Sequence, residues 1–373
     1  MIDRRLLKNF DWITFALVTI LSLIGVMTIY STTRPLPGLE YPSFYIKQVY
    51  WLGISLLCFI LVVSIDYRWF EKFAYPLFLI GFILLVLVLF VGKQGMGAQR
   101  WLPLGPLSFQ PSEFFKIFFI IAFAKYLASL GQGTMLGFKE TAKISFFFLL
   151  PPVIVILEQP HLGAALVLIF SSLGMSMAAG IRKKFFVLAL IIGIIAVPFL
   201  GHIFWGGLKE YQKNRIVAFV EPQVDPLGIG YHINQSKVSI GSGGFLGKGY
   251  LEGTQGSLRF LPAGHTDFIF SIFAEEWGFI GSIGLFIIYL FIFLRGIDTA
   301  RMAKDPFGSF LALGLTIMLT FYFVINVGMT LGMMPVVGLP LPFMSYGGTA
   351  LLSAFIAIGI LINVRTRRFA LFY

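Results

Sequence analysis

Asp267 is the first candidate for acid–base chemistry, because it stands where a polar segment runs into a long apolar one. The sequence around it reads LPAGHTDFIF over residues 261–270. An ordinary aspartate is ionised at neutral pH and is a weak base, but desolvation beside Phe268 and Phe270 would make its carboxylate a better proton acceptor. The other interpretation is that Asp267 caps the helix that follows and complements its dipole. Taken alone, the segment leaves both open and favours capping.

Two further carboxylates, Glu275 and Glu276, follow in the same apolar segment. A carboxylate at bilayer depth costs about 2.5–3.5 kcal/mol on insertion scales, so it is expected to face a cavity or a partner. At about 100° per residue, Glu275 lies about 80° from the helix face of Asp267, and Glu276 lies on the opposite side. We therefore expect Glu275 to share the cavity of Asp267 and Glu276 to pair with another helix.

A second cluster combines Arg100 and Trp101 with Glu113 and Lys116 of the segment QPSEFFK. Pro111 suits the first position of a helix and Glu113 its first turn, and Lys116 falls on the same face. One interpretation is a satisfied Glu113–Lys116 ion pair. The other is an anion site, with Lys116 and Arg100 facing a pyrophosphate and Trp101 offering a flat surface to a sugar or to the lipid interface.

Proline and glycine are dense between residues 334 and 348, which read MPVVGLPLPFMSYGG. So many helix breakers between two apolar segments indicate a re-entrant or cavity-lining loop. The stretch carries no charge, so we expect it to form a wall of the cavity rather than to contribute a catalyst.

The elements that must position these residues are membrane-spanning helices. Of 373 residues, 58% are hydrophobic and 12% are charged, and the mean hydropathy is +0.88; a soluble domain carries about 25% charged residues. The fold class is therefore all-α, a polytopic integral membrane protein forming one transmembrane domain over 1–373. A spanning helix needs roughly 20 mostly apolar residues. The ten candidate segments lie at about 12–31, 46–64, 74–92, 112–130, 143–157 (with a kink expected at Pro151-Pro152), 163–180, 185–204, 268–294, 308–332 and 344–363.

The orientation follows from the basic residues of the short loops, which concentrate on the cytoplasmic side of membranes. With the N-terminus inside and the spans alternating, 17 of the 28 Lys and Arg residues lie inside: Arg4, Arg5, Lys8, Arg68, Lys72, Lys125, Lys139, Lys143, Arg182, Lys183, Lys184, Arg295, Arg301, Lys304, Arg365, Arg367 and Arg368. An even number of spans returns the C-terminus to the cytoplasm. The net charge of +11 is thus distributed by membrane side, which argues against a nucleic-acid partner.

Most of the polar material is then outside, in a loop over about 205–266 between helices 7 and 8 that includes Arg215. Long polar loops commonly carry function. The expected result is an outward-facing cavity with carboxylates and cations between helices, which suits a lipid-linked anionic substrate and equally a transporter pathway.

The motifs taken together resemble the SEDS family (shape, elongation, division and sporulation proteins), over essentially the whole chain. They are GAQRW (97–101), QPSEFFK (110–116), YQKNRI (211–216), DPLGIGYHINQS (225–236), GTQGSLRFLP (253–262), HTDFIF (265–270) and GLPLPFMSYGG (338–348). The stretch GKGYLEGTQGSLRFLPAGHTDF looks more like the elongation branch, RodA, than the division branch, FtsW.

The resemblance implies a peptidoglycan glycosyltransferase that polymerises lipid II on the outer face of the bacterial cytoplasmic membrane. It places the catalytic aspartate at Asp267 and the cavity-lining residues at Arg100, Trp101, Glu113, Lys116 and Arg215. It also implies a partner, a class B penicillin-binding protein that supplies transpeptidase activity. Where the family commonly reads QPDLGT, this chain reads QPHLGA, so His161 replaces an acid and the nearby Glu158 is a candidate substitute for it.

The mechanism expected from this assignment is a single displacement. Asp267 would act as general base on the acceptor hydroxyl, and Arg215, Lys116 and Arg100 would stabilise the departing pyrophosphate. A divalent cation, Mg²⁺ or Mn²⁺, on the pyrophosphate is compatible with this chemistry, although the sequence shows no dedicated ligand set, and no organic cofactor is expected. The alternatives are a flippase or transporter of the lipid-linked precursor and a non-catalytic scaffold of the wall-synthesis complex.

Overall fold

The computed structural model describes residues 8–34, 43–95, 98–104, 107–131, 137, 140, 143–180, 213, 229–258, 260–261 and 263–368. The helices of this part of the chain are α2 (Trp12–Thr33), α3 (Phe44–Ser64), α4 (Tyr67–Lys72), α5 (Ala74–Val91), α6 (Pro111–Ser129), α8 (Leu150–Glu158), α9 (Leu162–Ala178), α12 (Ile229–Ser242), α13 (Thr254–Ser257), α14 (Ile269–Met302), α15 (Pro306–Thr330) and α16 (Gly348–Thr366). A π-helical segment, Ile144–Leu149, leads into α8.

Nine of the ten predicted spans coincide with these helices, and the tenth, at 185–204, lies outside the described residues. Within the described part of the chain, six helices are long and apolar enough to cross a membrane: α2, α3, α5, α14, α15 and α16. The kink predicted at Pro151-Pro152 corresponds to the change from π-helix to α-helix, where prolines occupy the first turn of α8. The chain is therefore a multi-pass helical membrane protein, as the sequence predicts.

The boundary of the last span differs from the prediction. We expected it to begin at residue 344, but α16 begins at Gly348, because residues 338–347 form the irregular loop that the prolines and glycines favour.

A small sheet that was not predicted from the sequence lies between α5 and α6. Strands β1 (Lys93–Gly95), β2 (Ala98–Leu104) and β3 (Leu107–Phe109) form an antiparallel meander in the order β1-β2-β3. The strands are too short for an alternating pattern to stand out in the sequence.

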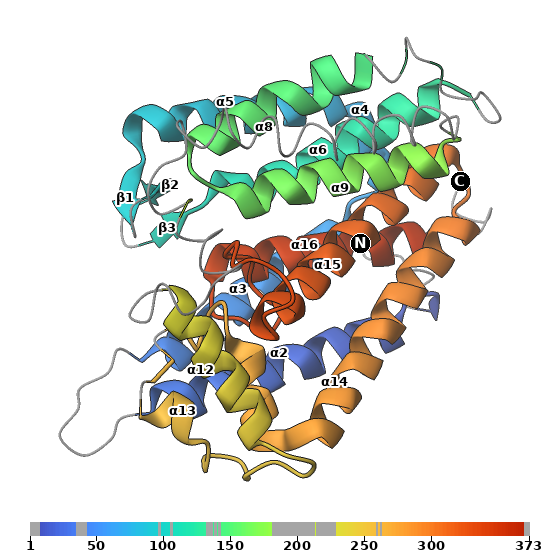
Figure 1. Ribbon diagram of the computed structural model, residues 1–373. Coiled ribbons are helices and arrows are strands. Elements are labelled where there is room, and N and C mark those ends of the chain that lie inside the picture. Colours follow the sequence, from blue (N-terminus) through green and yellow to red (C-terminus); the bar gives the residue numbers. More distant parts are fainter. Residues whose placement is uncertain are drawn as a thin grey trace.

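The helices pack with α15 in contact with α14, α9 and α6, and with α3 along α16 (Figure 1). One large apolar cluster draws buried residues from helices between α2 and α16. In Figure 1, α12 and α13 lie together beside the first turns of α14. The part of the long polar loop that precedes α14 thus folds onto that helix.

The first and last described helices meet at one side of the protein. Asp11 caps α2 through Thr14, and its carboxylate also binds Arg295 at 2.6 Å and Arg365 at 3.3 Å. Arg295 belongs to the C-terminal part of α14 and Arg365 to that of α16. The start of α2 and the ends of α14 and α16 therefore share a membrane side, as the predicted even number of spans requires.

Helix α14 is broken at Gly278, whose φ of 64° and ψ of −161° are not helical. The glycine-rich segment 243–249 fills the break with backbone hydrogen bonds. Lys248 and Gly249 donate to the carbonyls of Glu275 and Glu276, each at 3.0 Å. On the other side of the break, Phe279 and Ile280 donate to carbonyls of the same segment, at 3.0 and 3.2 Å. We call this arrangement, segment 243–249 bound to residues 275–280, the glycine clip.

Candidate active site

A cavity of about 440 Å³ lies where the N-terminal ends of α6, α9, α14 and α16 converge. This volume is within the range typical of small-molecule sites. Its lining residues are Arg100, Trp101, Gln110, Glu113, His161, Ala263, Thr266, Asp267, Gly338, Pro340, Tyr346, Gly347, Thr349 and Ala350. The structure therefore brings together four residues predicted from the sequence: Arg100, Trp101, Glu113 and Asp267.

Asp267 occupies the turn that precedes α14, and its side chain is half-buried. Phe268 donates its N–H to Ala263 O at 3.1 Å, which closes the turn, and Asn326 of α15 donates to the carbonyl oxygen of Asp267 at 2.9 Å. The helix N-cap is Phe268, and no side chain caps it. The interpretation of Asp267 as the helix cap is thus wrong: its backbone is held from two sides, and its side chain lines the cavity.

Arg100 and Trp101 reach the cavity from β2. The guanidinium of Arg100 donates to the carbonyl oxygens of Gln159, at 3.3 Å, and of Pro160. These carbonyls belong to the turn just before α9, so Arg100 fixes the position of that helix end. A cation on this wall also favours a negatively charged ligand.

His161 lines the cavity at the start of α9, and sequence reasoning did not include it among the site residues. Its Nδ1 lies 3.1 Å from Ser112 Oγ in the first turn of α6. Glu158, the substitute considered for the acid that the family has at position 161, is exposed at the end of α8 and does not line the cavity. That expectation is wrong, because the turn after Glu158 directs position 161, not 158, toward the cavity.

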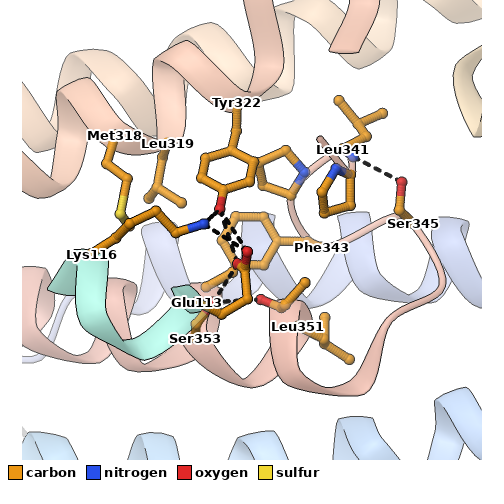
Figure 2. A pocket seen from close by; sticks show the side chains of 14 residues that line it. Glu113, Lys116, Met318, Leu319, Tyr322, Leu341, Phe343, Ser345, Leu351 and Ser353 are labelled. Atoms are coloured by element: carbon orange, nitrogen blue, oxygen red, sulfur yellow. Dashed lines mark hydrogen bonds and ion pairs between the residues drawn. The ribbon is translucent and has the colours of Figure 1, made fainter. Parts of the chain in front are cut away.

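Glu113 and Lys116 form an ion pair, one of the two interpretations left open by the sequence, with Lys116 Nζ 2.6 Å from Glu113 Oε1 (Figure 2). Both are almost fully buried, at 3% and 1% exposure. Tyr322 of α15 binds both residues, donating to Glu113 Oε2 at 2.9 Å. Lys116 lines a second, smaller cavity of about 20 Å³ that shares Glu113 with the large one. The pair is therefore satisfied internally, and Glu113 is its member at the large cavity.

Tyr322 had a weak signal in the sequence, as a polar group within an apolar span. Nothing local connects it to Glu113, which is 209 residues away in the chain.

Glu275 does not line the cavity of Asp267, so that expectation is wrong. Its buried carboxylate binds Lys248 Nζ at 2.6 Å and the backbone N–H of Thr254 at 2.8 Å. The loop after the glycine clip covers the helix face on which Glu275 lies. The prediction for Glu276 is confirmed, because its carboxylate accepts a hydrogen bond from Ser31 of α2.

The proline- and glycine-rich loop lines the cavity with Gly338, Pro340, Tyr346 and Gly347, which confirms that it forms a wall. Arg215, the remaining predicted cation, lies outside the described residues.

His265 supports this wall from behind. Its ring stacks on Phe44 at 4.6 Å between centroids, and its carbonyl oxygen accepts from the N–H of Tyr346 at 2.9 Å. Burial lowers the pKa of His265 below its ordinary value of 6.5. The imidazole is therefore neutral at neutral pH and serves as a flat packing group.

The carboxylates that line the cavity are Asp267 and Glu113. Glu113 is already bound to Lys116 and Tyr322. Among the described residues, no group of three or more His, Cys, Asp or Glu side chains is arranged to hold a metal ion. The described protein groups therefore do not form a dedicated cation site.

Comparison with known proteins gives relatives along nearly the whole chain. The family model for the cell cycle proteins FtsW, RodA and SpoVE matches residues 8–369. The peptidoglycan glycosyltransferase MrdB of Escherichia coli (strain K12) is 36% identical over 322 residues, which cover 86% of this chain and 85% of MrdB. The peptidoglycan glycosyltransferase RodA of Treponema pallidum (strain Nichols) is 33% identical, with 98% of this chain and 99% of RodA covered.

Solved structures agree in fold. A chain of a peptidoglycan synthase complex, described as coordinating polymerization and crosslinking, matches with a TM-score of 0.82 at 31% identity, covering 97% of this chain and 99% of its own. The rod shape determining protein RodA of Thermus thermophilus matches with a TM-score of 0.71 at 29% identity, covering 96% and 98%. Because the family model and these relatives match along nearly the whole chain, the chain belongs to the FtsW, RodA and SpoVE family, which is the SEDS family that its sequence resembles.

Proposed function

We propose that this protein is a peptidoglycan glycosyltransferase that polymerises lipid II during cell elongation. The observation that carries the proposal is the position of Asp267, which lines the same 440 Å³ cavity as Arg100. The relatives named peptidoglycan glycosyltransferase support the reaction class.

Asp267 takes the proton of the acceptor hydroxyl as the hydroxyl oxygen attacks the anomeric carbon of the donor sugar. The bond from that carbon to the pyrophosphate oxygen breaks, and the polyprenyl pyrophosphate leaves with the bonding electrons. Because the backbone of Asp267 is held by Asn326 and by the turn to Ala263, the carboxylate keeps its place while the proton moves. Positioned general bases typically contribute 10²–10⁴-fold.

Trp101 and Tyr346 offer aromatic surfaces to the sugars, and Arg100 offers positive charge to the leaving group. Glu113 and Lys116 act behind them as a neutral, fixed pair. A divalent cation, Mg²⁺ or Mn²⁺, would be coordinated by the pyrophosphate oxygens of the substrate and would offset their negative charge.

The cavity lies at the opposite end of α14 and α16 from the Asp11 cluster. With the termini in the cytoplasm, as the basic residues indicate, the site faces the outside of the bacterial cytoplasmic membrane. The polyprenyl tail then lies in the bilayer while the sugars enter the cavity. The matched synthase complex supports a partner for this chain, for which we propose a class B penicillin-binding protein.

The test is polymerisation of labelled lipid II by purified protein with its partner, comparing the wild type with Asp267→Asn. The substitution keeps the size of the side chain and removes the base, so we expect a loss of 10²–10⁴-fold with an unchanged unfolding temperature. Polymerisation at the wild-type rate would refute the assignment. Translocation of lipid II across vesicles without polymer, abolished by the same substitution, would indicate a transporter instead.

A further inference from the structure

The start of α16 is a part of the cavity wall to which the proposed mechanism assigns no role. Gly347, Thr349 and Ala350 all line the cavity. The first intrahelical hydrogen bond runs from Leu351 N–H to Gly347 O at 2.9 Å. The N–H groups of Gly348, Thr349 and Ala350 therefore have no acceptor within the helix, and they form the positive end of its dipole.

Thr349 provides a second and independent sign of a ligand. Its side chain is 2% exposed, and its hydroxyl oxygen is buried without a hydrogen-bond partner. A buried hydroxyl without a partner is costly, and native proteins seldom retain one. Because threonine occupies two χ1 rotamers in helices, a rotation about χ1 can exchange the positions of the methyl and hydroxyl groups at the cavity wall.

The two glycines before Thr349 have different explanations. A Cβ on Gly348 would collide with the indole ring of Trp51, so packing alone requires glycine there. A Cβ on Gly347 would meet only the Cβ of Ala350, at an ordinary 3.6 Å. Packing therefore does not explain Gly347. Its lack of a side chain instead leaves the backbone N–H groups open to close approach by a ligand.

We propose that the N-terminus of α16, with the N–H groups of Gly348–Ala350 and the hydroxyl of Thr349, binds the diphosphate of the polyprenyl-linked donor. A diphosphate fits because a helix N-terminus favours a compact anion with several acceptor oxygens. Arg100 lies on the wall of the same cavity, and the negative charge of Glu113 is offset by Lys116. Asp267 then stands at the sugar end of the donor. This inference rests on the proposed function and assigns a subsite within it.

The probe for the test is farnesyl pyrophosphate, bound to the full-length protein in detergent. In the first variant, Gly347→Asp, the carboxylate reaches the free N–H groups as a helix cap and repels the diphosphate. We expect an unfolding temperature equal to or above that of the wild type, together with at least a tenfold weaker Kd. Gly347→Asn is the matched neutral control, and its Kd should lie between those of the wild type and Gly347→Asp.

Thr349→Val removes the hydroxyl at constant shape and should weaken binding by about tenfold, the effect of one hydrogen bond to a charged group. Thr366→Val is the control at the far end of the same helix, where the hydroxyl only binds Ile362 O, and its Kd should equal that of the wild type. Thr349→Ser keeps the hydroxyl, so its Kd should be close to that of the wild type.

Competition identifies the source of the anion. Inorganic pyrophosphate should displace the probe, whereas phosphatidylglycerol and farnesol should not. A wild-type Kd in Gly347→Asp, or displacement by phosphatidylglycerol as effective as by pyrophosphate, would overturn the subsite. Asp267→Asn separates this inference from the proposed reaction, because that variant, with one negative charge fewer in the cavity, should bind the probe at least as tightly as the wild type and yet fail in polymerisation.

Discussion

Lys248 binds Glu275 twice, through its backbone N–H to Glu275 O at 3.0 Å and through its ammonium to Glu275 Oε1 at 2.6 Å. The first contact fills the break in α14, and the second neutralises a carboxylate that is fully buried. The glycine clip thus holds the short first part of α14, which begins two residues after Asp267, against the rest of the helix. Glu275, which the sequence placed in the cavity of Asp267, is instead part of the support for α14.

The clip makes Gly247 a position where no side chain is tolerated. Its φ is +84°, and a Cβ there would collide with Glu276 O. We expect Gly247→Ala to destabilise the protein by more than about 3 kcal/mol, because it combines backbone strain with overlap. The measurement is thermal unfolding in detergent. Gly284→Ala is the control within α14, since a Cβ there meets nothing within 4 Å; equal unfolding temperatures for the two variants would contradict the clip.

Removing one member of the Glu113–Lys116 pair should destabilise the protein more than replacing both members with uncharged residues. Glu113→Gln leaves a buried ammonium without its counter-charge, so we expect a loss of about 3–5 kcal/mol. The double variant Glu113→Gln/Lys116→Met removes both charges and should recover much of that loss. A double-mutant cycle of unfolding free energies checks this, and additive effects of the two substitutions would show that the residues do not interact.

Asp11 should be important for stability although it is far from the cavity. Burial by itself raises the pKa of Asp11, but hydrogen bonds from Arg295 and Thr14 outweigh burial and hold the pKa below the ordinary 3.8. Asp11→Ala removes the counter-charge of two arginines and the cap of α2, and should cost about 3 kcal/mol. Asp66→Ala is the control on the same side. It also removes a helix cap, that of α4, but Asp66 is more exposed and its contact with Arg367 is longer, at 3.6 Å; it should cost only about 1 kcal/mol.

Because His265 is buried as a neutral imidazole, we expect the folded protein to lose stability in acid. Its folded pKa lies below the ordinary 6.5, so the unfolded chain takes up a proton that the folded protein does not. The contribution of His265 is thus complete above about pH 6.5 and is lost as the pH falls toward its folded pKa. Unfolding temperatures between about pH 8 and pH 5 should fall more steeply for the wild type than for His265→Phe, which keeps a ring against Phe44. Parallel curves would rule out this role for His265.

How much the sequence could predict depended on the distance between interacting residues. The spans follow from long apolar runs, and the Glu113–Lys116 pair follows from a spacing of three residues on one helix. Glu275 was misplaced because residues 248–255, which lie 20 to 27 positions upstream, cover its face of α14. Thr349 could not be recognised, because its significance depends on a cavity assembled from four helix ends. Local periodicity carries no information about such convergence.

The Asp11 cluster has a consequence for the order of biosynthesis. Asp11 leaves the ribosome before its partner Arg295, which follows 284 positions later. At about 5–20 residues per second, the interval is roughly 15–60 s. During that time α2 resides in the membrane without the arginines that will neutralise its first turn, so the bundle can close on this side only when the C-terminal helices arrive. The closure of this side therefore joins segments of the chain that are synthesised far apart in time.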